Sequence, residues 1–300
     1  MTRVATFSNY QNLLNMSMNV QSDVSSKQLD IASGKISENY YDLASSTNLI
    51  LDLEHSMSTS EQYIDNAEQV SAQVEATYAA LNSMVDVMAN FTSSVTASLG
   101  GTDDVEELNA TAQASLEEMG ALLNQQYGDI YLFGGTDTGQ APVDVSSASY
   151  TAQTYPSTVS TDYYSGNDET RSFHADDNYE INYGVTANES AFEKAIRAMS
   201  MMANMDPHDE DAIAEAHDLM NEATAEIAAL QAEVSVTASN IENTIDAHTN
   251  AQLITESMLG DLTEVDVAEA TAELNQLQAQ LEASFSAISN ATSLNLIDYL

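Results

Sequence analysis

Residue types that can carry chemistry occur along this chain, but their spacing forms no recognisable site. Two histidines three or four residues apart on a helix can hold a metal ion, because both rings then lie on one face. None of the five histidines has such a neighbour, so we predict that they are scattered over the surface: His55, His174, His208, His217 and His248. The chain has no cysteine, which excludes disulfides and thiolate sites. We therefore predict no metal site and no cofactor.

Carboxylate and glycine pairs give no stronger signal for catalysis. Adjacent acids such as Asp103 and Asp104 could act as an acid and a base, but the chain has 47 acidic residues and helix capping explains such pairs. Gly134 and Gly135 follow an apolar triplet, yet no lysine and no phosphate-loop spacing follow them, so a turn is the better interpretation. No nucleophile has a neighbouring base. We predict no catalytic residues and no enzymatic activity.

The charge of the chain excludes several classes of function. Lys and Arg total 6 and Asp and Glu total 47, which gives a formal net charge of −41. Such a chain would be repelled by nucleic-acid phosphates and by anionic membrane surfaces. No apolar run is long enough to span a membrane, and residues 1–20 lack the apolar core of a cleaved signal peptide. The acidity fits a solvated surface tuned for solubility or adaptation to a salty exterior.

Both ends of the chain carry apolar residues at helical spacing. The residues recur every three or four positions, as in a coiled-coil seam, and Gly34 is a plausible end for the first helix. One helix cannot bury such a stripe alone. We expect the ends to pair with each other and with neighbouring copies, and to order fully only on packing. The predicted assembly interface comprises Leu13, Met16, Val20, Val24, Ile31, Val267, Leu274, Leu277, Leu281, Phe285, Ile288, Leu294 and Leu296.

The segments next to the two ends also read as long helices. The pattern predicts a helix over 47–99, broken by Gly100 and Gly101, and a second helix that Asp104 caps and that ends near Gly128. Helices joined by such a short turn should be antiparallel. After the middle of the chain, helix returns at 189–204.

Residues 136–188 differ in composition from both helical arms. They are rich in Ser, Thr and Tyr, and alternation over 179–185 predicts a strand with one buried face. Residues 165–168 (Ser-Gly-Asn-Asp) predict a turn. The sequence therefore predicts a small β-rich insert within a mainly α protein, a long antiparallel helical bundle made from both chain ends.

The last third of the chain predicts two more helices. Pro207 is expected at the first helical position after Asp206, Gly260 is expected to break the helix, and residues 263–266 (Thr-Glu-Val-Asp) are expected to cap the final one. The predicted divisions are an assembly helix and turn (1–45), a helical arm (46–135), the β-rich insert (136–188), a second arm (189–258) and a C-terminal assembly helix (259–300).

Four strings resemble those of bacterial flagellins and flagellin-like proteins. Residues 31–36 (Ile-Ala-Ser-Gly-Lys-Ile) are similar to a Leu-Ser-Ser-Gly string near the flagellin start, and residues 266–270 to the acidic start of the last flagellin helix. Residues 131–136 (Tyr-Leu-Phe-Gly-Gly-Thr) and the ending at 296–300 (Leu-Ile-Asp-Tyr-Leu) resemble the hook–filament junction branch of this superfamily. The strings occur in order at both ends, so the chain resembles that branch.

The resemblance implies a structural subunit of the flagellum that joins hook to filament by self-assembly. Its partners would be copies of itself, the other hook-associated protein, flagellin and an export chaperone, with no nucleic acid and no membrane insertion. It would be extracellular, exported without a cleaved signal peptide, with an outward-facing insert. A filament flagellin is the first alternative. A coiled-coil adhesin or a phage tail fibre, which would show one continuous trimeric heptad run, is the next, and a signalling coiled coil is less consistent with the insert.

The net charge predicts how self-association depends on salt. Subunits that each carry −41 repel one another, and added salt screens that repulsion, so association should strengthen as NaCl rises from about 0.05 to 0.5 M. Sedimentation velocity of the purified chain at fixed concentration measures the effect. If association instead weakens as the salt concentration rises from low to moderate, acidic faces do not lie opposite each other in the contact.

Overall fold

The computed structural model describes residues 2–36, 46–99, 105–147 and 150–297, without the side chains of 2–7, 9 and 291–297. The chain forms two compact units. Unit 1 comprises Met1–Thr59 and Ala251–Leu300, and unit 2 comprises Ser60–Asn250. The predicted fold class is confirmed, because long helices from both chain ends pack against each other and the middle of the chain contains a small β insert.

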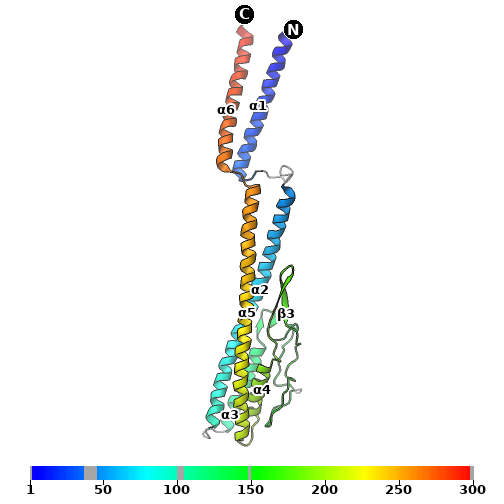
Figure 1. Ribbon diagram of the computed structural model, residues 1–300, viewed down its shortest axis with the longest axis vertical. Helices are drawn as coiled ribbons and strands as arrows, with labels where there is room; N and C mark the ends of the chain where they lie inside the picture. Colours follow the sequence, from blue (N-terminus) through cyan, green and yellow to red (C-terminus); the bar gives the residue numbers. More distant parts are fainter. Residues whose placement is uncertain (1, 37–45, 100–104, 148–149, 298–300) are drawn as a thin grey trace. The chain divides into compact units, whose positions relative to one another are not determined.

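Helices dominate the described residues (Figure 1). They are α1 (Thr2–Ser33), α2 (Thr47–Leu99), α3 (Val105–Leu123), α4 (Ser190–Ala203), α5 (Glu210–Thr263) and α6 (Val267–Ile297). The strands form two antiparallel pairs: β1 (Gln126–Tyr127) with β2 (Ile130–Tyr131), and β3 (Arg171–Asp176) with β4 (Tyr179–Tyr183). No described helix combines the length and apolar character that a membrane crossing requires. The helices α2 and α5 each contribute residues to both units.

Unit 2 contains the hydrophobic core. Its side chains come from α2, α3, α4 and α5 and from several parts of the insert, including β3 and β4, and most have no exposed surface. Phe133 packs edge-on against Phe192 of α4, with ring centroids 5.9 Å apart. Methionines fill much of the remaining space, as expected where helices leave irregular gaps. The largest contributors include Leu81, Met84, Met88, Phe91, Met119, Leu123, Phe133, Phe192, Ile196, Met199, Ile213, Met220 and Ile227.

Buried polar groups tie the insert to α4. Glu193 is 4% exposed, its carboxylate lies 3.1 Å from Arg197 Nε, and it accepts a hydrogen bond from Ser160 N at 3.2 Å. Arg197 also donates to Ser157 Oγ at 3.4 Å. Tyr163 donates to the Ala187 carbonyl at 3.0 Å, and burial raises the pKa of this phenol. The irregular part of the insert that precedes β3 is therefore held in place by specific hydrogen bonds as well as by apolar packing.

The residues 131–136 form a tight corner where the insert leaves the helical core. Thr136 N donates to Asn167 Oδ1 at 2.9 Å, and Ala187 N donates to the Phe133 carbonyl at 2.9 Å. Gly135 has a φ of +69°, and a Cβ there would lie 2.4 Å from the Asn167 carbonyl oxygen. Only glycine fits this backbone and this contact. The predicted turn at these residues is confirmed, and its glycine is required by a close backbone approach.

Several predicted helix ends are confirmed or corrected. Gly34 ends α1 with a φ of +72°, as predicted. The prediction for Pro207 is wrong, because α5 begins at Glu210, where Asp209 caps it by accepting from Asp211 N at 3.0 Å. The predicted break at Gly260 is also wrong. A single glycine costs only about 1 kcal/mol inside a helix, and α5 continues to Thr263.

The end of α3 also differs from the prediction. The helix stops at Leu123 rather than near Gly128, and a two-residue turn at Gly128 and Asp129 then connects β1 to β2. The glycine supplies the positive φ, +61°, that this turn needs. The turn predicted at the end of segment 1–45, the break at Gly100 and Gly101 and the Asp104 cap lie outside the described residues.

The corner at Gly135 yields a stability test. Replacement Gly135→Ala should lower the free energy of unfolding by at least about 2 kcal/mol, because alanine disfavours a positive φ and its methyl would strike the Asn167 carbonyl. Gly139→Ala is the matched control, since a Cβ there meets nothing within 4 Å, and it should change stability by less than about 0.5 kcal/mol. Urea unfolding followed by circular dichroism measures both. Equal midpoints for the two variants would contradict the role of the corner.

Candidate assembly interface

The helices α1 and α6 form an antiparallel pair in unit 1, with both chain termini at the same end of the pair (Figure 1). Buried and partly buried side chains recur on each helix at alternating steps of four and three, which is the spacing of a two-helix seam. On α1 they include Leu13, Ser17, Val20, Val24, Lys27 and Ile31, and on α6 they are Ala270, Leu274, Leu277, Leu281, Ser284 and Ile288. No other described side chain of α6 is buried, even in part. The pair therefore has one narrow seam.

The seam buries little apolar area because small side chains occupy two of its most buried positions. Ser17 is 4% exposed and Ala270 is 2% exposed, whereas the leucines around them are only partly buried. Small residues let two helices approach closely, but they contribute little apolar area. Val24, at 8% exposed, is the one large apolar side chain fully buried among the described seam residues. The pair is held together without a wide core.

An ion pair crosses the seam and helps to set its register. Lys27 Nζ of α1 lies 2.8 Å from Glu273 Oε2 of α6 and 4.0 Å from Asp30. The hydrogen bond to Glu273 raises the pKa of Lys27. Both side chains are partly exposed, so the pair adds more to alignment than to stability.

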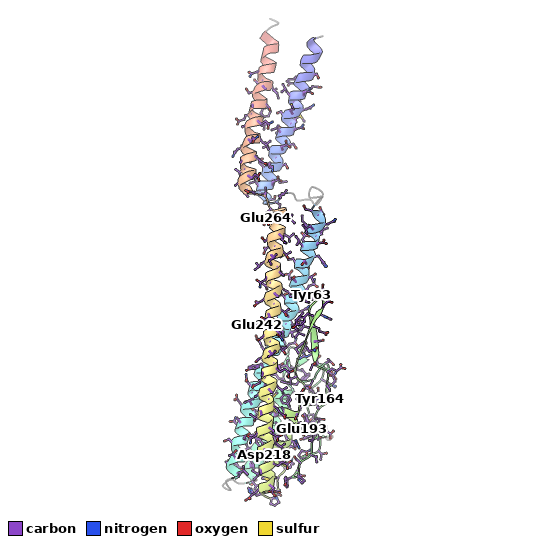
Figure 2. The ribbon with its side chains drawn as sticks, viewed as in Figure 1. Tyr63, Tyr164, Glu193, Asp218, Glu242 and Glu264 are labelled. Carbon is purple, nitrogen blue, oxygen red and sulfur yellow. The ribbon has the colours of Figure 1, made fainter. Side chains whose placement is uncertain are left out.

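Backbone bonds close the other end of the helix pair. Ile36 N donates to the Thr263 carbonyl at 2.8 Å, and Val265 N donates to the Gly34 carbonyl at 3.0 Å. Glu264, labelled in Figure 2, lies in this bridge between α5 and α6. Asp266 then caps α6 as predicted, since its carboxylate accepts from Ala268 N at 2.9 Å and Glu269 N at 3.1 Å.

Much apolar surface on unit 1 remains uncovered. Three apolar residues of this unit are buried among the described side chains: Val24, Ile50 and Ala270. Twelve large apolar residues are exposed in the same unit: Leu14, Met16, Met18, Leu29, Ile36, Leu49, Leu51, Leu253, Ile254, Met258, Val267 and Phe285. In unit 2 the proportion is reversed. This exposed apolar surface makes unit 1 the candidate region for contact with other proteins.

The structure divides the predicted interface residues into two sets. Leu13, Val20, Val24 and Ile31 of α1 and Leu274, Leu277, Leu281 and Ile288 of α6 line the seam. Met16, Val267 and Phe285 do not, being 65%, 52% and 52% exposed. Val267 and Phe285 are five helical turns apart and therefore share one edge of α6. The side chains of Leu294 and Leu296 lie outside the described residues.

A hydrophobicity pattern alone missed the polar members of the seam. Ser17 and Ser284 carry no apolar signal, and alanine at 270 is common on any helix. A search for steps of four and three irrespective of residue type would have found them. It would also have separated Met16 from the seam, because Ser17, one residue later, holds the position in register.

One histidine, His248, makes more contacts than the predicted surface position implies. His248 of α5 stacks on Tyr63 of α2, with ring centroids 5.0 Å apart, and its Nε2 lies 2.8 Å from the Ala175 carbonyl of β3. Tyr63, labelled in Figure 2, donates to Asp177 Oδ1 at 2.8 Å, and this bond raises the pKa of its phenol. Together these side chains attach the β3–β4 hairpin to two helices of unit 2.

The described residues offer little for ligand chemistry. A cleft of about 270 Å³ lies between α2, β4 and α5, next to Glu189 and Glu233. Burial, and then the carboxylates of Glu233 and Glu226, raise the pKa of Glu189. No group of three His, Asp or Glu in the described part of the chain could hold a metal ion. The apolar surface of unit 1 is thus the feature that most needs a functional explanation.

Comparison with known proteins finds a family match in the C-terminal part of the chain. Residues 217–300 match the family model of the bacterial flagellin C-terminal helical region, which covers most of α5 and all of α6. No curated protein sequence is detectably similar to the chain. The predicted resemblance to the flagellin superfamily is confirmed over this region.

Solved structures share the fold. A protein of Vibrio parahaemolyticus described as a flagellar hook-associated protein superposes with a TM-score of 0.63 at 16% identity, over 74% of this chain and 100% of that one. FlgL of Bacillus cereus superposes with a TM-score of 0.56 at 15% identity, over 71% of this chain and 99% of that one. At these identities the likeness concerns the fold.

The thin seam predicts weak protection of the helix pair in the free subunit. Backbone amides of residues 270–288 should exchange at least about tenfold faster than those of α4, because α4 is enclosed by the core and α6 is covered along one stripe. Hydrogen exchange with mass spectrometry on dilute subunit and on assembled protein measures this difference. Assembly should slow exchange in 270–288 and leave α4 unchanged. Equal protection of both helices in the dilute subunit would contradict the prediction.

Proposed function

We propose that this chain, which carries the flagellin C-terminal helical region, is a structural subunit of the bacterial flagellum. In this proposal it joins the hook to the filament by helix-mediated self-assembly and has no enzymatic role. The chain spans the whole length of the hook-associated protein of Vibrio parahaemolyticus and nearly all of FlgL. Its place in the structure would be extracellular, in the flagellum.

The apolar surface of unit 1 is the observation that carries the proposal. A subunit that buries three apolar residues and exposes twelve large ones in one unit needs other molecules to cover that unit. Both ends of the chain meet in it, as assembly through paired terminal helices requires. An enzyme would instead concentrate its distinctive features in a cleft, and no such concentration occurs in the described residues.

Two sequence strings favour the junction over the filament. The residues 131–136 form the glycine corner, and the chain ends in Leu-Ile-Asp-Tyr-Leu, and both resemble the hook–filament junction branch. The names of the two structural relatives are consistent with this choice. A filament flagellin is the alternative. A coiled-coil adhesin or phage tail fibre is less consistent with an antiparallel pairing of the two ends.

The proposal also assigns partners and segments. Copies of the chain, the other hook-associated protein and flagellin would cover unit 1, and an export chaperone would hold the subunit before assembly. Segments 1–45 and 259–300 would form the assembly region, segments 46–135 and 189–258 the helical arms, and segment 136–188 an outward-facing insert. Each of these assignments is what the resemblance to flagellins implies for this chain.

The position of the protein on the flagellum tests the proposal. Fluorescently labelled protein should appear as a single band at the base of each filament. Label along the whole filament would instead identify a flagellin, and label that is absent from flagella would overturn the assignment. The full-length protein, expressed in a motile strain that lacks its own copy, is the material for this test.

A pair of charge-matched variants tests the role of the exposed edge of α6. Phe285→Asp should abolish the band, because it removes an aromatic side chain and places a carboxylate in the contact, at least about 3 kcal/mol or a hundredfold in occupancy. Gln276→Asp adds the same charge to an exposed position elsewhere on α6 and should retain the band. The free subunits should unfold at the same urea concentration as the unmodified chain. Loss of the band in both variants would point to charge alone.

A further inference from the structure

The methionines divide between the two units according to their exposure. Eight methionines of unit 2 are at most 6% exposed: Met84, Met88, Met119, Met199, Met201, Met202, Met205 and Met220. In unit 1, Met16 is 65% exposed, Met18 is 59% exposed and Met258 is 51% exposed. Met57 is partly buried, and Met1 lies outside the described residues. The exposed thioethers thus all belong to the unit that the proposed function assigns to assembly.

Each exposed methionine belongs to an apolar pair on its helix. Met16 is one turn from Val20, Met18 is one turn from Leu14, and Met258 is one turn from Ile254. Side chains four residues apart on a helix contact each other, so each sulfur lies within an apolar patch. Leu14 and Ile254 are themselves exposed, at 41% and 60%. These patches would be covered when subunits pack together.

We propose that Met16, Met18 and Met258 are sites at which a hydroperoxide oxidises the free subunit and thereby prevents its assembly. This inference rests on the proposed function, because it needs the three side chains to enter subunit contacts. The methionines of unit 2 are shielded by the core and remain thioethers under the same treatment. Assembly in turn shields the three exposed sulfurs.

The reaction needs no group from the protein beyond the thioether. A sulfur lone pair attacks one oxygen of the hydroperoxide, a sulfur–oxygen bond forms and the oxygen–oxygen bond breaks. The leaving oxygen takes a proton, so hydrogen peroxide gives water, and the sulfur is oxidised by two electrons. The product is a sulfoxide, a polar and chiral group in place of an apolar one. A sulfoxide buried without a hydrogen-bond donor opposes packing.

Peroxide treatment of the purified full-length subunit tests the proposal. Peptide mass spectrometry should find sulfoxide at the three exposed positions at least about tenfold faster than at Met84, Met199 or Met220. The oxidised subunit should need a roughly tenfold higher concentration to self-associate than the untreated one, measured by sedimentation velocity in moderate salt. Methionine sulfoxide reductases should restore association. The variant carrying Met16→Leu, Met18→Leu and Met258→Leu has no sulfur at these positions, so peroxide should not change its association from the level that the same variant shows before treatment.

Each outcome separates this inference from the function on which it rests. Oxidation at the three sites with unchanged association would overturn the inference and leave the proposed function intact. Oxidation spread evenly over both units, or loss of association in the leucine variant after peroxide, would also overturn it. Failure of the untreated chain to associate under any salt condition would overturn both the proposed function and the inference.

Discussion

The structure depends on a limit of geometry: a single helix pair can bury only the stripe along which its two members meet. In α1 and α6 that stripe is narrow, and Ser17 and Ala270, two of its most buried side chains, add little apolar area. The leucines beside them are only partly covered. Apolar residues on the other faces, such as Phe285 and Leu14, are 52% and 41% exposed. The described part of unit 1 therefore buries little apolar surface of its own, and under the proposed function contacts with other molecules would add the rest.

Unit 2, in contrast, buries most of its apolar residues within itself, and its few basic residues help to hold its elements together. Arg171 of β3 donates to Gln73 of α2 at 2.8 Å, Lys194 of α4 lies 2.8 Å from Glu222 of α5, and Arg197 bonds the insert. Each cation joins elements that are distant in sequence, as Lys27 does in unit 1. Although carboxylates greatly outnumber basic residues, most of the described Lys and Arg side chains form ion pairs or hydrogen bonds with other elements of the same chain. The net charge remains on the outside, where salt can screen it.

The sequence was informative about elements and less so about their contacts. Spacing of apolar residues located the long helices, and the end of α1 followed from Gly34. Spacing could not show that α5 passes through Gly260, because the neighbouring helical bonds outweigh the preference of one residue. Nor could spacing show which apolar side chains of α1 face α6, or which side chains of α6 face α1. Met16 and Val20 look equivalent in a pattern of apolar residues, but Met16 is exposed because Ser17 and Val20 hold the register of the seam.

The contrast between the units suggests why assembly and folding are separated in one chain. The core of unit 2 needs no partner, since its helices enclose Phe192, Ile196 and their neighbours completely. It can therefore exist as a stable body before any subunit contact forms. Under the proposed function, other molecules would lie against α1 and α6 and cover the apolar residues of unit 1, so the free energy of ordering the chain ends would be part of the free energy of association. The free subunit would then owe its stability to the core of unit 2, and its chain ends would become fully ordered where neighbours are already in place.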